Sequence, residues 1–193
     1  MRLQSIFKGI KEMRIKDLPV EDMTPKQRSI RDDIVTGPRG QLQGPLKVWL
    51  TSPRLADKAQ KLGQFCRYET SLPPHLSELA ILVTGRFWGA EYEWYAHKKI
   101  GLDAGLDPKV VESIRQRRIP DFSSEAEKII YEFATQLHND HRVGDATYTA
   151  AVKEFGETGT VDLVGILGYY TLISMTLNTF QVPLPDGIKE ELD

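Results

Sequence analysis

The hydrophobic positions of this chain recur with helical spacing, and no segment alternates convincingly between apolar and polar residues at period two. The most regular stretch, residues 72–106, has the pattern of two helices joined by a tight turn at Trp88-Gly89-Ala90. Between residues 76 and 85 of this stretch, Glu78 is the only charged residue. The pattern therefore predicts an all-α fold, with about six to eight helices bundled in a single domain.

The second predicted helix of this stretch carries two titratable residues on its apolar side. Positions i, i+3, i+4 and i+7 share one helical face, so Glu93 and His97 lie together. Titratable groups among apolar neighbours must be paired or have displaced pKa values, which suits a general acid/base site. A buried Glu–His pair is also a common structural contact that only fixes helix packing. The same face holds Ala90, Trp94, Gly101 and Ala104, and the opposite face carries Glu91, Lys98, Lys99 and Asp103.

Capping residues and prolines mark the other helices. Along the segment 53–68, Leu55, Ala59, Leu62 and Cys66 lie close to one face, so Cys66 is predicted to be a small core residue. Thr24, Ser52, Ser124 and Asp145 are predicted to cap helices, and FGETG at 155–159 is predicted to break one. The predicted helices cover residues 25–34, 45–50, 53–68, 108–115, 125–137, 145–155 and 160–180.

Three polar segments separate the predicted helices. The glycine-rich loop 37–45 lacks any phosphate-binding motif, but its Arg39 is a candidate to hold an anion. The basic segment 115–121 is interpreted as a solvated connector. The predicted loop 137–145 holds His138 and His141 without a third ligand at a recognised spacing, so no metal site is predicted.

The last predicted helix raises a membrane question, because residues 163–180 carry no charge. Glycine, hydroxyl and amide residues occur on several of its sides, which favours burial in the core and at a subunit interface instead. We therefore expect no membrane partner. We also expect an N-terminal arm at residues 1–22, a helical domain at 23–187 and an acidic tail at 188–193.

The composition of the chain excludes several classes of function. The chain has 193 residues, a net charge of -2 and one cysteine, Cys66. The near-neutral charge gives no general attraction for nucleic acid, and one thiol cannot build a disulfide framework, a zinc knuckle or a Cys-x-x-Cys pair. The start of the chain lacks the apolar run of a signal peptide. These features lead us to expect a cytoplasmic protein.

The run LPPHLSELAILVTGRFWGAEYEWYAHKKIGLDAGL at residues 72–106 resembles the core motif of the carboxymuconolactone decarboxylase family, which includes the alkylhydroperoxidase D proteins. Softer matches are GPRG at 37–40, WLTSPRLADKAQKLG at 49–63 and VDLVGILGYYTLISMTLNTF at 161–180. The resemblance implies an all-α, alkylhydroperoxidase D-like bundle that forms a homo-oligomer, a trimer or a hexamer. We expect the protein to need no cofactor.

The peroxidase branch of that family has the motif E-x11-C-x2-C-x3-H. On this chain the motif falls on Glu78, Ala90, Glu93 and His97, so both thiols are missing. Cys66 lies outside the motif. Dithiol peroxide reduction needs an attacking thiolate and a resolving cysteine. The resemblance therefore implies a peroxidase-type site without peroxidase chemistry, closer to the decarboxylase branch.

The expected function is that of a decarboxylase-like lyase acting by acid/base chemistry on a small cyclic carboxylate or lactone. His97 is the expected proton donor, titrating near neutrality, Glu93 would tune or exchange its proton, and Glu78 would complete a relay. The first alternative is a non-catalytic oligomer that binds a small molecule. The second is a peroxidase- or peroxiredoxin-type activity, which rests on the family resemblance alone and is disfavoured by the absent thiols. The residues expected to contact an anionic substrate are Tyr92 and Trp94, as pocket walls, with Arg39 and Arg86.

Overall fold

The computed structural model describes residues 13–192, and within that range all regular structure is helical, which confirms the all-α prediction. The elements are a 3-10 turn η1 (Val20–Asp22) and the helices α1 (Pro25–Thr36), α2 (Pro45–Trp49), α3 (Pro53–Tyr68), α4 (Pro74–Trp88), α5 (Glu91–Asp103), α6 (Pro108–Arg115), α7 (Glu125–Asp140) and α8 (Asp145–Phe180).

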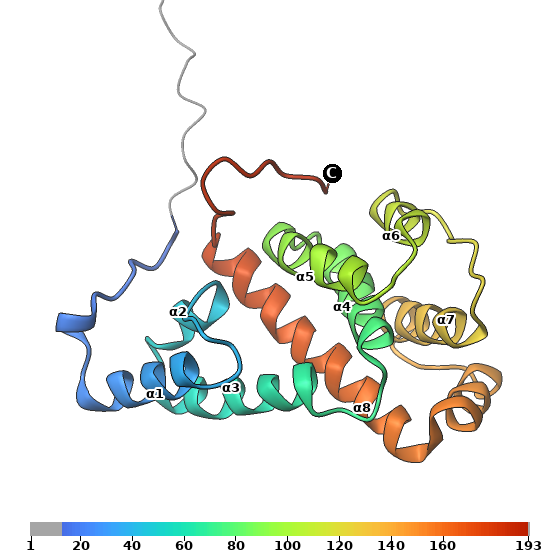
Figure 1. The fold of residues 1–193 in the computed structure, drawn as a ribbon, viewed down its shortest axis with the longest axis horizontal. Helices are drawn as coiled ribbons and strands as arrows, with labels where there is room; N and C mark the ends of the chain where they lie inside the picture. Colours follow the sequence, from blue (N-terminus) through green and yellow to red (C-terminus); the bar gives the residue numbers. More distant parts are fainter. Residues whose placement is uncertain (1–12, 193) are drawn as a thin grey trace, which may run out of the picture.

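Helix α8 is the central element, and it crosses the molecule between α1–α3 and α4–α7 (Figure 1). It bends at Gly156, whose φ of 71° and ψ of 175° are not helical, so the break predicted in FGETG is a kink inside one element. It is also the one described helix long and apolar enough to cross a membrane by length and composition. Because 56% of its apolar window is buried against other helices, it has the character of a core helix.

The helix starts follow their capping signals in part. Thr24 and Gln27 form a capping box at α1, and the Ser124 hydroxyl accepts from the backbone N–H of Glu127 at α7. Ser52 occupies the predicted N-cap position of α3, before Pro53, but its side chain makes no capping hydrogen bond. The predicted cap at Asp145 is wrong, because Asp145 is already the first residue of α8.

The inward face of α3 differs from the one predicted. Leu55 and Leu62 are 42% and 47% exposed, whereas Ala59, Gly63 and Cys66 are buried. The reason is close packing on α8: a Cβ added at Gly63 would lie 1.9 Å from the Tyr169 hydroxyl. Small residues therefore face inward, and the large apolar ones face out.

Two other boundaries change. Helix α7 continues to Asp140, so His138 lies on a helix and not in the predicted loop. In the predicted arm, the backbone N–H of Arg14 donates to the carbonyl of Phe180, 2.9 Å away, which ties this segment to the end of α8. The first 12 residues of the arm lie outside the described residues.

Candidate functional site

The connection between α4 and α5 sets the position of the site. Gly89 adopts φ 57°, the left-handed conformation that ends α4, and the N–H of Ala90 donates to the carbonyl of Gly85. At the other end, a Cβ on Gly101 would lie 3.5 Å from the Glu78 Cβ and 2.9 Å from the Leu106 side chain. The small residue lets α5 lie directly against the face of α4 that carries Glu78.

His97 lies between two carboxylates in the core. Its Nδ1 is 2.7 Å from Oε2 of Glu78 on α4, and its Nε2 is 3.0 Å from Oε1 of Glu93 on its own helix. All three side chains are at most 6% exposed. The Glu78 contact has hydrogen-bond geometry, but the Glu93 oxygen lies off the direction of the Nε2–H bond. The structure thus brings together the three residues predicted to be catalytic.

The pKa of His97 is raised from 6.5 to about 9. Burial by itself lowers this pKa, but the charges of Glu93 and Glu78 and the hydrogen bond to Glu78 outweigh it. The imidazole therefore carries its proton at neutral pH. The expectation that His97 titrates near neutrality is wrong, because it rested on the residue alone and not on two carboxylates at contact distance.

Two tyrosines of α8 complete the surroundings of His97. The Tyr170 ring meets the imidazole edge-to-face, with centroids 5.0 Å apart. Burial, then the charges of Glu93 and Glu78, hold the pKa of Tyr170 well above its usual range, so its hydroxyl stays protonated. Next to it, the Tyr169 hydroxyl accepts a hydrogen bond from Nη2 of Arg39 at 3.4 Å. The sequence reading missed both tyrosines as site residues, although they stand out as a pair in an uncharged helix.

A cavity of about 100 Å³ opens beside His97 and Glu93. Its lining includes Tyr92 and Arg39, which were both predicted to contact a substrate. Arg67 of α3, which no sequence pattern singled out, lines it as well. The remaining lining residues are Gln41, Gln43, Pro45, Leu46, Ala96, Tyr169, Tyr170 and Ile173.

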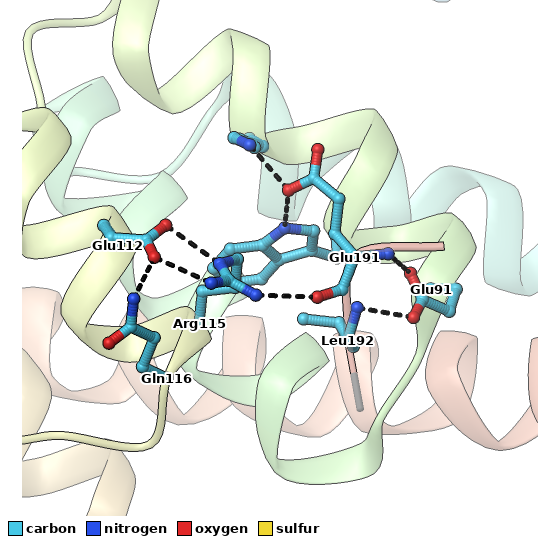
Figure 2. A network of polar contacts seen from close by, with 8 residues as sticks. Glu91, Glu112, Arg115, Gln116, Glu191 and Leu192 are labelled. Atoms are coloured by element: carbon cyan, nitrogen blue, oxygen red, sulfur yellow. Dashed lines mark hydrogen bonds and ion pairs between the residues drawn. The ribbon is translucent and has the colours of Figure 1, made fainter. Parts of the chain in front are cut away.

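Two predicted substrate contacts lie elsewhere. Trp94 is 1% exposed, and its Nε1 donates to Oε2 of Glu191 in the C-terminal segment, 3.2 Å away. That segment is held because Glu91 accepts from the backbone N–H groups of Glu191 and Leu192 (Figure 2). Arg86 is buried and lines a different cavity, against α7. Neither residue lines the cavity beside His97.

The single thiol does not belong to the site. Cys66 is fully buried, and burial, then the nearby charge of Asp162, raises its pKa to about 11. A thiol in this state is not a nucleophile at neutral pH. Within residues 13–192, no group of three or more His, Cys, Asp or Glu residues is placed to hold a metal ion.

The fold matches solved structures. An uncharacterized peroxidase-related protein from Ralstonia eutropha, with an alkylhydroperoxidase AhpD core, superposes with a TM-score of 0.72 over 90% of this chain and 93% of its own, at 16% identity. A peroxidase-related protein from Silicibacter gives 0.72 over 95% and 96%, at 12% identity. The debrominase Bmp8 in complex with 2,3,4-tribromopyrrole gives 0.70 over 93% and 94%, at 14% identity.

No family model matches the sequence, and no curated protein matches it. At these identities the superpositions establish the fold alone. The chain has the helical fold of alkylhydroperoxidase D-like proteins over nearly its whole length, as the resemblance implied.

Proposed function

We propose that this protein is an acid/base enzyme that decarboxylates, or moves a proton on, a small cyclic carboxylate or lactone. The observation that carries the proposal is the imidazole of His97 held between Glu78 and Glu93 at the wall of a cavity, where its pKa is raised to about 9. An acid with a raised pKa, next to a second proton carrier, is the arrangement that general acid catalysis needs.

The charges around the cavity favour an anionic substrate. Arg39 and Arg67 line it, and with protonated His97 they outnumber the carboxylates of Glu78 and Glu93. A guanidinium group suits a substrate carboxylate, to which it donates paired hydrogen bonds. An apolar cavity of about 150 Å³ holds one benzene ring, and this cavity of about 100 Å³ is smaller, so we expect a substrate no larger than a single small ring. The tribromopyrrole in the debrominase complex is also a single ring.

In the decarboxylation that we propose, Arg39 and Arg67 hold the substrate while the bond to its carboxylate carbon breaks. Carbon dioxide leaves, and the electron pair stays on the ring as an enolate conjugated with the lactone carbonyl. His97 then transfers its Nε2 proton to the ring carbon, since that proton is not aligned on Glu93. Water restores the proton through Glu93, so one proton is consumed for each carbon dioxide released.

The test is turnover of a panel of five- and six-membered lactone acids and cyclic carboxylates, followed by carbon dioxide release or by exchange of a ring hydrogen in D₂O. His97→Gln should lower kcat of any substrate at least ~100-fold, because it removes the general acid. His75→Gln, at the first turn of α4, is the matched control and should keep full activity. Undiminished turnover by His97→Gln would refute the mechanism. Binding without turnover of the whole panel would favour the non-catalytic alternative.

We also propose that the protein is a homo-oligomer, a trimer or a hexamer. The support is that helices α3 and α8, which pack on each other, both expose large apolar side chains in the single chain. Light scattering should give a multiple of the 21.9 kDa chain mass, and Val161→Glu should shift it to the monomer. A wild-type monomer would contradict the proposal. The exposed residues are Leu55, Leu62, Phe65, Tyr68, Val161, Val164 and Met175.

A further inference from the structure

A second cavity, of about 170 Å³, lies on the opposite side of α4, between α4, the end of α6 and α7. Three arginines, Arg86, Arg117 and Arg118, line it. We propose that it binds a small organic anion: one carboxylate or phosphate head on a single apolar ring. The proposal is independent of the function proposed for the His97 cavity, because the two cavities share no lining residue.

The lining of the second cavity is basic. Drawn from the described residues, it contains no aspartate or glutamate beside its three arginines. Arg86 is 4% exposed and already has an interaction of its own within the protein, whereas Arg117 and Arg118 are exposed and are the two guanidinium groups open to a ligand. The basic segment 115–121 was predicted to be a solvated connector, and its Arg117 and Arg118 are exposed while they also line this cavity. Such convergence on a concave surface favours an anionic head group.

The backbone at the cavity rim is held in a conformation that its residue disfavours. Helix α6 ends in a motif in which the N–H of Arg117 donates to Ile114 and that of Arg118 donates to Ser113. Arg117 has φ 55° at the position where glycine is usual. A side chain there costs about 1 kcal/mol relative to glycine. The same left-handed cap conformation occurs at His141 and Gln181, so the feature particular to Arg117 is that it lines the cavity.

The remaining walls suit an apolar ring and a neutral imidazole. His138 stacks on Phe87, with centroids 4.8 Å apart and an interplanar angle of 12°. The Thr84 hydroxyl donates its only hydrogen to the Ala80 carbonyl. Its oxygen lies 3.0 Å from Nε2 of His138, so in that contact the oxygen accepts and Nε2–H donates. The Nδ1 atom is then left unprotonated. Val83, Phe87, Ile114 and Tyr131 supply the apolar lining, and Thr135 and Asn139 supply neutral polar groups.

Benzoate, benzyl alcohol and inorganic phosphate separate the contributions of charge and ring. Binding is followed by NMR of the His138 ring, one of four histidines, assigned with His138→Gln. From the shift of this signal, benzoate should have a Kd at least ~10-fold lower than that of either other probe, because only benzoate has both the anion and the ring. Equal binding of phosphate, equal binding of benzyl alcohol, or no shift with any probe would each overturn the proposal. The His97 signal reports binding in the other cavity separately.

Arginine variants separate binding from folding. Arg117→Gly should weaken benzoate roughly 10-fold while leaving Tm unchanged or higher, since glycine suits φ 55°. Arg118→Gln should weaken it by a similar factor, whereas Arg142→Gln, an exposed arginine outside this cavity, is the charge-matched control. If Arg142→Gln weakens benzoate as much as Arg118→Gln, net charge and not the cavity is responsible, and the proposal fails.

Discussion

Two histidines on opposite sides of α4 show how strongly the same side chain depends on its neighbours. His97 faces α4 from α5, meets two carboxylates, and has its pKa raised to about 9. His138 faces α4 from α7, meets the Thr84 hydroxyl and the Phe87 ring, and has its pKa lowered by burial. One is an imidazolium at neutral pH, and the other is a neutral base.

The difference shows that burial alone does not decide whether a histidine is charged. Burial lowers the pKa of both residues, and only His97 has acidic partners whose attraction exceeds that penalty. The two sides of α4 therefore present opposite electrostatics. The α5 side combines carboxylates with a proton donor, and the α7 side combines guanidinium groups with a neutral imidazole.

The largest expected effect is on the pH dependence of stability. The pKa of His97 in the folded chain lies above its unfolded value of 6.5. Its contribution is therefore complete below pH ~6.5 and is lost as the pH rises to ~9. That shift corresponds to about 3 kcal/mol of unfolding free energy. Urea unfolding between about pH 6 and pH 10 measures this decline.

The double variant Glu78→Gln/Glu93→Gln removes the two charges and keeps the side-chain shapes. Burial then lowers the pKa of His97, so the decline above pH ~6.5 should disappear. His75→Gln is the control and should keep the wild-type decline. A double variant with an unchanged pH profile would show that the two carboxylates do not set the charge of His97.

A smaller effect should follow from giving His138 an acidic partner. Thr84→Asp places a carboxylate against its Nε2–H and should raise the pKa of His138, which a histidine NMR titration measures. The fold should lose about 1–3 kcal/mol, because the buried Thr84 hydroxyl also bonds the Ala80 carbonyl. Thr84→Asn is the neutral control and should leave the pKa lowered. Equal pKa values in the two variants would break the comparison between the histidines.

The sequence was sufficient for the parts of the fold that depend on local signals. The turn at Gly89 needs a left-handed residue, and Thr24 caps α1 through its own neighbours, so both were predictable. The buried face of α3 was not predictable, because hydrophobic periodicity predicts that Leu55 and Leu62 are buried. Contact with α8 selects the small residues instead, since Gly63 must accommodate Tyr169.

The residues of the candidate site also separate into those that the sequence indicates and those that only tertiary contacts bring in. Glu93 and His97 meet through helical spacing within α5. Glu78 is recognisable as the only charged residue between positions 76 and 85, and the family resemblance places it in the same site. Tyr170 and Arg67 reach the cavity from α8 and α3, and no spacing within one helix indicates such contacts. Trp94 was misplaced because the apolar stripe of α5 is wide enough to face both the core and the C-terminal segment that covers it.

The smallest expected effect lies on the acid side of the pH scale. Because the folded pKa of His138 is lowered, the unfolded chain binds its proton more readily, and His138 reduces stability as the pH falls through ~6.5. His138→Gln keeps a donor for the Thr84 hydroxyl and removes the titration. The variant should therefore lose less stability than the wild type between about pH 7 and pH 5, measured by urea midpoints at constant m-value. Equal losses of stability in the two proteins would mean that folding does not lower the pKa of His138. Only His97 would then have a pKa that folding shifts.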